Sequence, residues 1–331
     1  MSKKPKVGMW SGLTAVTAVL TAGAIVGTTV AFHYTTTVNN YLDADTYKII
    51  KGDSDEDTEY FKSDFTSDEE RESYEAELCA QVEAEGAALL KNDNNALPLA
   101  SGAKVSLFGH GSVDLMYGGT GSGSVDTSKA PNFKQALEDQ GIQVNSTLWD
   151  LYSSDDMMKN YSRITPAAIS DTLEANTQYA VNEAPWSKLS SAESSFADYG
   201  DAAIVVFSRS GGEGADLPSG ENGTNDSWIK GQEGDGNYLA LSAEEKELLQ
   251  NLKTLKDNGT FKKIIVLINS SNAIEMDFLN PEICGEDYGI DSAMWIGDVG
   301  QTGINGVAQL LAGEVTPSTP RLTPTQQITT C

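Results

Sequence analysis

The sequence predicts an α/β domain, a mainly parallel sheet sandwiched between helices, preceded by one N-terminal transmembrane helix. Two runs, AAIVVFSRS and KKIIVLINSS, are almost wholly apolar, as expected for strands buried on both faces. Amphipathic helical patterns alternate with such runs, which is typical of a parallel sheet covered on both sides. A third observation is an uncharged stretch of 25 residues near the N-terminus, long enough to cross a bilayer.

The N-terminal segment resembles a membrane anchor. Three lysines lie within residues 1–7, and no charge occurs across residues 8–32. Because lysines before a span keep that side inside the cell, we expect residues 1–7 in the cytoplasm and the rest outside. A cleaved signal peptide is the alternative, although its apolar core is normally about 7–15 residues. The expected location is therefore the cell membrane, with a single pass and an extracellular domain.

The charge of the chain excludes several partners. There are 48 acidic and 22 basic residues, for a net charge of −26. Such a surface repels nucleic acid phosphates and anionic lipid headgroups but not a neutral ligand such as a sugar. Residues 33–70 are strongly acidic and poor in large aliphatics, so they are interpreted as a tether before a folded domain at 71–322. Residues 323–331 are expected to be an unstructured tail.

The folded part begins with a helix at about Glu70, capped by Thr66 or Ser67. Its apolar residues recur at near-helical spacing: Tyr74, Leu78, Val82 and Leu89. A capping box from Ser242 to Glu245 predicts a later helix. The remaining elements are expected in this order: a strand at 105–111, a helix at 131–140, a second strand within 142–152, strands at 202–210, 262–271 and 292–300, and a closing helix at 303–315.

Cysteine and histidine are too few for most metal and redox chemistry. The three cysteines have no CxxC spacing, and there are only two histidines. We therefore expect no metal site and no cofactor.

Three glycine-rich loops follow predicted strands, where ligands of parallel sheets bind. The first, at 117–125, has four glycines and includes Gly119 and Ser122, so backbone N–H groups can approach a ligand closely. Such a loop could bind phosphate, but the lysine of the Walker pattern is absent. A mobile surface loop is the alternative interpretation. The third loop, at 295–303, suits a tight strand-to-helix turn, and Trp295 is expected either to stack on a sugar or to lie in the core.

The second loop, at 208–216, carries a single carboxylate among glycines. Glu213 is expected to be exposed and movable, as a general acid must be if its substrate is held elsewhere. Arg209 is expected either to bind sugar hydroxyls or to pair with Asp216 and hold the loop.

These motifs, in this order, resemble the α/β-sandwich domain of family 3 glycoside hydrolases, the β-glucosidase and β-xylosidase family. The similarity opens with EGAALLKN and LPL, continues through the three loops, and ends with GEVTPS and Arg321-Leu322. The resemblance implies an (α/β)6-sandwich and a retaining mechanism, with a nucleophilic Asp on a separate (β/α)8-type barrel. Glu213 would be the general acid/base, within about 5–5.5 Å of that nucleophile. The candidate substrate-binding residues are Arg209, Asp216, Gly119 and Ser122.

The sequence departs from the family in two respects. It contains no barrel-length segment, so the chain resembles the first half of a permuted member, and the barrel is expected in cis or in trans. Leu217 also stands where the family commonly has Arg. The expected function is the sandwich-domain part of a retaining β-glycosidase acting on an oligosaccharide or glycoside. A non-catalytic cell-surface carbohydrate-binding or scaffold module, or a truncated remnant, is the alternative.

Overall fold

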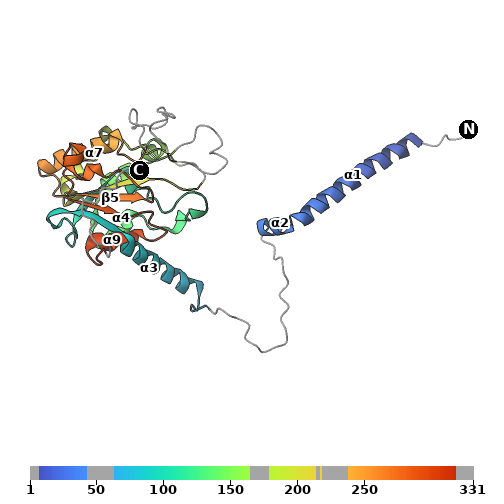
Figure 1. Cartoon of the computed structure of the whole chain (residues 1–331), viewed down its shortest axis with the longest axis horizontal. Helices are drawn as coiled ribbons and strands as arrows, with labels where there is room; N and C mark the ends of the chain where they lie inside the picture. Colours follow the sequence, from blue (N-terminus) through green and yellow to red (C-terminus); the bar gives the residue numbers. More distant parts are fainter. Residues whose placement is uncertain (1–6, 43–62, 165–178, 214–216, 218–237, 318–331) are drawn as a thin grey trace, which may run out of the picture. The chain divides into compact units, whose positions relative to one another are not determined.

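The computed structural model describes residues 7–42, 63–164, 179–213, 217 and 238–317 (Figure 1). The chain divides into two units, Met1–Asp64 and Phe65–Cys331, and each is described separately. The tail at 323–331, and most of the acidic segment at 33–70, lie outside the described residues.

The first unit contains two helices, α1 (Val7–His33) and α2 (Thr35–Tyr41). The segment Trp10–His33 has a mean hydropathy of 1.8 and is long and apolar enough to cross a membrane, a test that a signal sequence also passes. Its threonine hydroxyls donate to carbonyl oxygens four residues back, as Thr14 does to Trp10 at 2.9 Å. Such bonds satisfy hydroxyl groups without water.

The second unit is built on one six-stranded sheet with the order β1-β6-β5-β4-β2-β3. All neighbouring strands run parallel except the edge pair β1 and β6, which is antiparallel. The prediction of a mainly parallel sheet is therefore confirmed. The strands are β1 (Ala88–Asn92), β2 (Lys104–Phe108), β3 (Gln143–Val144), β4 (Ala202–Arg209), β5 (Ile264–Ser270) and β6 (Ser292–Trp295).

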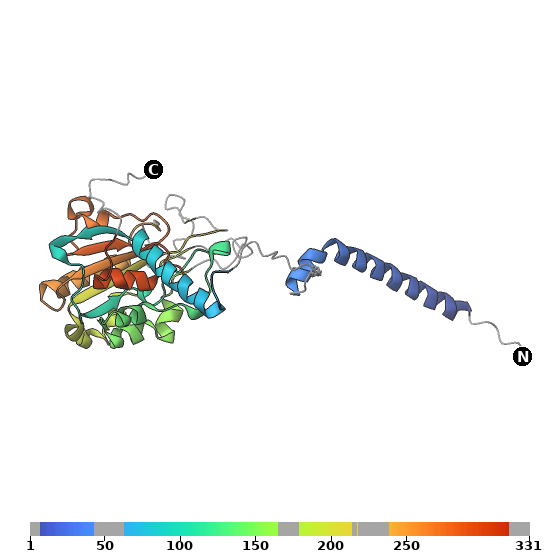
Figure 2. The same cartoon turned by 90° about the horizontal axis from the view of Figure 1, so that it is seen from below.

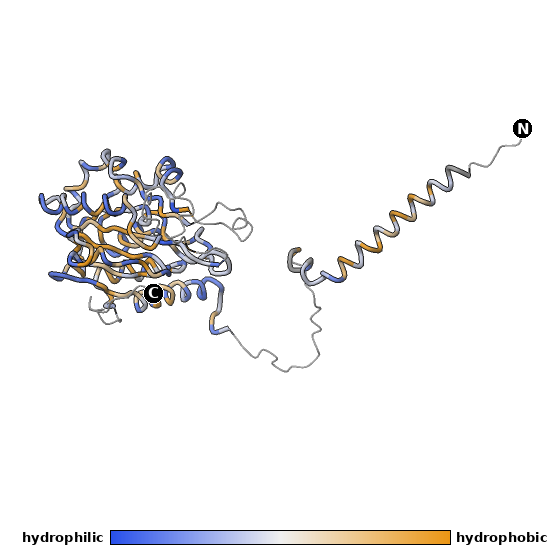
Figure 3. Tube along the Cα trace, turned by 45° about the horizontal axis from the view of Figure 1, so that its top comes forward, coloured by the Kyte–Doolittle hydropathy of each residue, from blue (hydrophilic) through white to orange (hydrophobic). Residues whose placement is uncertain are grey.

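Helices cover both faces of the sheet (Figures 1 and 2). Alternate residues of β4 point to opposite sides, so Ile204 and Val206 join one core cluster while Val205 and Phe207 join the other. Figure 3 shows the resulting apolar interior along the strands. The helices of this unit are α3 (Asp68–Gly86), α4 (Phe133–Asp139), α5 (Ser146–Tyr152), α6 (Asp155–Asn160), α7 (Ala243–Asp257), α8 (Pro281–Cys284) and α9 (Ile304–Ala312).

Local signals in the sequence set the helix starts. Ser67 caps α3, and the capping box at Ser242 and Glu245 opens α7, as predicted. The expected strand within 142–152 is only two residues long, because Asn145 accepts a hydrogen bond from Leu148 and begins α5.

The apolar spacing in α3 does not mark its packed face. Tyr74 is 52% exposed and Val82 is 62% exposed, whereas Ala80 and Ala84 are buried. The small alanines let α9 approach closely, since a Cβ at Gly306 would lie 2.1 Å from the Ala80 carbonyl oxygen. Leu89 lies beyond the helix, in β1.

A buried ion pair joins the end of β4 to the start of α7. Arg209 is 0% exposed, and its guanidinium donates to both Glu245 carboxylate oxygens, at 2.8 and 2.7 Å. The remaining N–H groups donate to the carbonyl oxygens of Ser208, Tyr238 and Ala240. Every donor of the side chain is thus used inside the protein.

A buried carboxyl also lies behind the carboxyl end of β2. Glu183 accepts hydrogen bonds from the backbone N–H groups of His110 at 2.7 Å and Ala184 at 3.0 Å. Burial raises the pKa of Glu183 to about 7, in spite of the opposing effect of His110. The folded protein therefore holds this carboxyl in its neutral form more readily than the unfolded chain does.

We predict that Glu245→Ala lowers the free energy of unfolding by about 3–5 kcal/mol, because it leaves the Arg209 charge buried without a partner. Urea denaturation measures this change. Glu247→Ala is the control, since Glu247 is exposed on the same helix and its removal is expected to change stability by less than about 1 kcal/mol. Equal effects of the two substitutions would contradict the assigned role of the ion pair.

We also predict that Glu183 makes stability decrease as the pH rises from about 4.5 to about 7. The folded pKa is raised above the ordinary glutamate value of 4.5, so the folded state binds the extra proton in this range and loses the advantage above it. Glu183→Gln, compared with the exposed-site control Glu138→Gln, should flatten the pH dependence of the urea midpoint. A Glu183→Gln profile parallel to that of the unmodified chain would refute this prediction.

Candidate functional site

The three glycine-rich loops meet at the carboxyl edge of the sheet. The first loop pairs with the second through an isolated bridge between Thr120 and Gly212. The third loop bonds to the residues that enter the first: Val299 N donates to Met116 O at 3.1 Å, and Gly300 N donates to Tyr117 O at 2.8 Å. These residues are far apart in the sequence, so the parallel topology has brought them to one place.

Asn269, at the end of β5, holds two of these loops together. Its side-chain oxygen accepts from Met116 N at 2.6 Å, and its amide N–H groups donate to Met116 O at 3.0 Å and Gly297 O at 2.6 Å. The side chain is fully buried. Asn269 was not predicted as a site residue, although an Asn at the end of an apolar strand is a signal of a buried polar contact.

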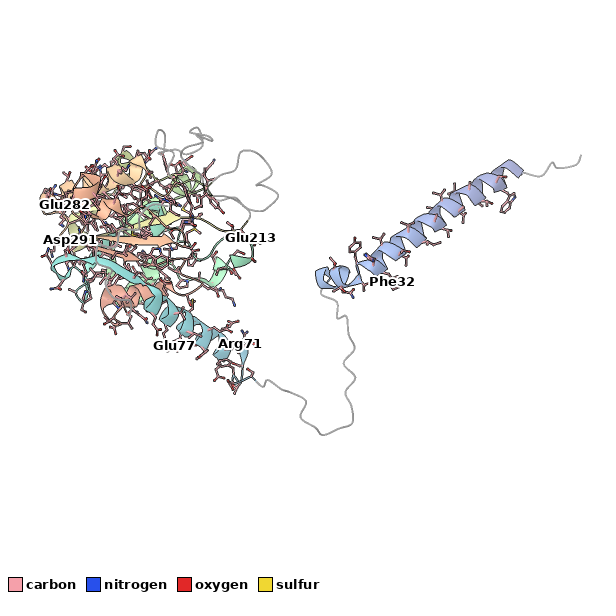
Figure 4. All side chains as sticks on the ribbon, viewed as in Figure 1. Phe32, Arg71, Glu77, Glu213, Glu282 and Asp291 are labelled. Carbon is pink, nitrogen blue, oxygen red and sulfur yellow. The ribbon has the colours of Figure 1, made fainter. Side chains whose placement is uncertain are left out.

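Glu213 lies on the surface of this edge, as predicted. Figure 4 shows it at the end of the sheet opposite Asp291, which precedes β6. One carboxylate oxygen of Glu213, Oε2, accepts from Ser122 N at 3.1 Å and from Ser122 Oγ at 3.0 Å. The Glu213 backbone oxygen accepts from Thr120 Oγ1 at 3.0 Å.

These contacts set the charge of Glu213. Its pKa is lowered, first by the backbone hydrogen bond from Ser122 and then by the Ser122 hydroxyl. Donors that face a carboxylate favour its ionised form, so the side chain is anionic at neutral pH here. The ionised Glu213 carboxylate can accept a proton. To donate one, it needs an environment that raises its pKa.

The other predicted site residues have different positions in the structure. Gly119 lies against the second loop, since a Cβ there would be 3.3 Å from Gly211 O. It is also 3.7 Å, by the same measure, from the Cα of Gly212, the residue before Glu213. Asp216 lies outside the described residues, so neither its contact with a sugar nor its pairing with Arg209 is seen.

The expected contact between Arg209 and sugar hydroxyls is wrong. The side chain is 0% exposed and gives its donors to Glu245 and to backbone oxygens. Sequence spacing could not reveal this, because the partner lies on α7, 36 residues later in the chain. The role of Arg209 is to fix the base of the second loop.

A second, more buried pair of carboxyl groups lies beside the third loop: Glu83 of α3 and Asp298 of the loop itself. Burial raises the pKa of Glu83 to about 8, with a further contribution from the charge of Asp298. Burial also raises the pKa of Asp298, against hydrogen bonds from Ser271. Trp295 is partly buried and packs against one core cluster of the sheet.

No metal centre is formed by the described residues, among which no three His, Cys, Asp or Glu side chains gather closely enough to hold an ion. Glu213 is an exposed carboxylate of this edge, set among backbone and hydroxyl donors of the first loop. Such a group suits proton transfer to or from a ligand bound against the three loops.

The chain is similar to known β-glucosidases. It is 30% identical over 244 residues to a β-glucosidase of Ruminococcus albus, which covers 73% of this chain and 22% of that protein. It is also 30% identical over 259 residues to β-glucosidase A of Butyrivibrio fibrisolvens, covering 73% and 27%. The chain thus spans about a quarter of the length of these relatives.

Solved structures agree on the fold. A β-glucosidase from Paenibacillus barengoltzii matches with a TM-score of 0.55 and 28% identity, over 73% of this chain and 23% of that one. β-Glucosidase 3B from Thermotoga neapolitana, solved with α-D-glucose, matches with a TM-score of 0.52 and 23% identity, over 74% and 30%. The second likeness concerns the fold alone.

A match over most of the chain identifies its family. Residues 87–329, most of the chain, match the glycosyl hydrolase family 3 C-terminal domain. This range contains all three glycine-rich loops and all six strands of the sheet. The chain therefore belongs to the glycosyl hydrolase family 3 C-terminal domain family.

Proposed function

We propose that this domain supplies the general acid/base of a retaining β-glycosidase, and that Glu213 is that residue. The observation that carries the proposal is the place of Glu213: an exposed carboxylate at the carboxyl edge of the sheet, beside Ser122 of the first loop. The substrate class would be a β-glucoside or a related oligosaccharide, as the names of the relatives suggest.

The reaction needs a second carboxylate from a (β/α)8-type barrel, in cis or in trans. Its Asp would attack the anomeric carbon while protonated Glu213 gives its proton to the leaving oxygen, so that the glycosidic bond breaks as an ester bond forms. Glu213, now anionic, would then take a proton from water as the water oxygen displaces the Asp. The two carboxyl groups would stand about 5–5.5 Å apart.

The first step requires a protonated Glu213, whereas its pKa is lowered in this structure. Covering the edge with the barrel would remove water from the carboxylate and raise its pKa. The exposed position of Glu213 leaves room for this covering.

We further propose that α1 anchors the domain at the cell membrane, with residues 1–7 in the cytoplasm and the domain outside. The apolar span Trp10–His33 and the lysines before it support this orientation. A span of this length satisfies its own backbone hydrogen bonds within a bilayer.

We predict that Glu213→Gln lowers kcat for alkyl β-glucosides by about 10²- to 10⁴-fold in the enzyme completed with its barrel domain. Aryl glucosides with strongly acidic leaving groups should be affected less in the bond-breaking step, because their leaving oxygen needs little protonation. Steady-state kinetics on a series of leaving groups makes the measurement. Glu193→Gln is the control, since Glu193 is an exposed glutamate in another part of the domain. A uniform effect on kcat/KM, which reports the bond-breaking step, or no effect on it, would remove Glu213 from the acid role.

We also predict that the full chain stays in the membrane fraction after an alkaline wash, and that added protease digests the domain on intact cells. Replacement of Ala18 and Ile25 by Asp should release the chain from the membrane, because charges within the span disfavour insertion. Quantitative release of the unmodified chain into the medium would support a cleaved signal peptide instead.

A further inference from the structure

The first glycine-rich loop closes on the side chain that the proposed reaction uses. Ser122 gives two hydrogen bonds to a single oxygen of Glu213, one from its backbone N–H at 3.1 Å and one from its hydroxyl at 3.0 Å. Thr120, two residues earlier, donates its hydroxyl to the Glu213 backbone oxygen at 3.0 Å. The loop thus fixes both the main chain and the carboxylate of this residue.

We propose that Ser122 is a positioning residue that clamps the Glu213 carboxylate to the first glycine-rich loop. The importance of the clamp for catalysis rests on the role proposed above for Glu213. The clamp itself is a property of the free domain, so it can be tested without substrate or barrel.

The backbone around Ser122 is shaped for this contact. Gly121 has a φ of +73°, where a side chain would be strained. A Cβ at Gly121 would also lie 2.5 Å from Glu213 Oε2 and 2.7 Å from Glu213 Cβ. Only glycine at this position lets the carboxylate reach the Ser122 N–H group.

The second loop also packs closely against the first at Gly212. A Cβ at Gly212 would lie 2.4 Å from both the nitrogen and the hydroxyl oxygen of Thr120. Thr120 Oγ1 is also within 3.3 Å of the hydroxyl of Tyr179, a fully buried side chain. The clamp is therefore attached through Thr120 to the interior of the domain.

The clamp affects both halves of the proposed reaction. It stabilises the carboxylate, which makes Glu213 a weaker base toward water in the second half. It opposes the protonated form, which donates to the leaving oxygen in the first half. The hydroxyl of Ser122 has one proton to donate, so a ligand that took it would free Glu213 from one of the two bonds.

The experiment is a titration of the Glu213 carboxyl by NMR in the full chain, with Glu213→Gln identifying its signal. Ser122→Ala removes one donor, and we expect the measured pKa of Glu213 to shift upward. Ser122→Thr keeps a hydroxyl and should restore the value. Gly121→Ala keeps Ser122 but pushes the carboxylate away, so its effect should have the same direction as that of Ser122→Ala.

Ser124→Ala is the matched control, an exposed serine of the same loop that should leave the titration unchanged. Circular dichroism of each variant checks that the fold is retained. An unchanged Glu213 pKa in both Ser122→Ala and Gly121→Ala would overturn the clamp. The kinetic test of Glu213→Gln is separate, so the proposed function can fail while the clamp holds, and the reverse is also possible.

Discussion

The buried ion pair between Arg209 and Glu245 is the contact on which the geometry of the carboxyl edge depends. An isolated charge inside a protein is strongly unfavourable, so each of these side chains requires the other. The guanidinium also satisfies the backbone oxygens of Tyr238 and Ala240, which would otherwise be without donors in the interior. The end of β4, the start of α7 and the residues Tyr238 and Ala240 are therefore held to one arrangement.

This rigidity explains how an exposed side chain can still be well placed. Glu213 follows Arg209 by four residues, and the intervening Ser210 is fully buried. Ser210 O accepts from the hydroxyl of Tyr238 at 2.9 Å and from the side-chain amide of Asn272 at 3.1 Å. The backbone of the second loop is thus fixed at Ser210, three residues before the exposed Glu213.

Much of the fold could be predicted from the sequence because its signals are local. The runs that form β4 and β5 are apolar throughout, and the Ser242 capping box needs only four residues. The partner of Arg209 could not be predicted, because Glu245 already had a local role as part of that box. Asn269 was missed for a related reason: its contacts join loops that are adjacent only after folding. In α3 the spacing of large apolar residues was misleading, because small alanines make the close contact with α9.

The two borders of the sheet differ from its centre in a way that affects how the domain behaves beside other chains. One border is β3, which has only two residues, and the other is β1, whose pairing with β6 is irregular between Leu89 and Lys91. Short or interrupted edges offer few free N–H and C=O groups to a foreign strand. The domain consequently has little tendency to join neighbouring copies sheet to sheet, even at high local concentration.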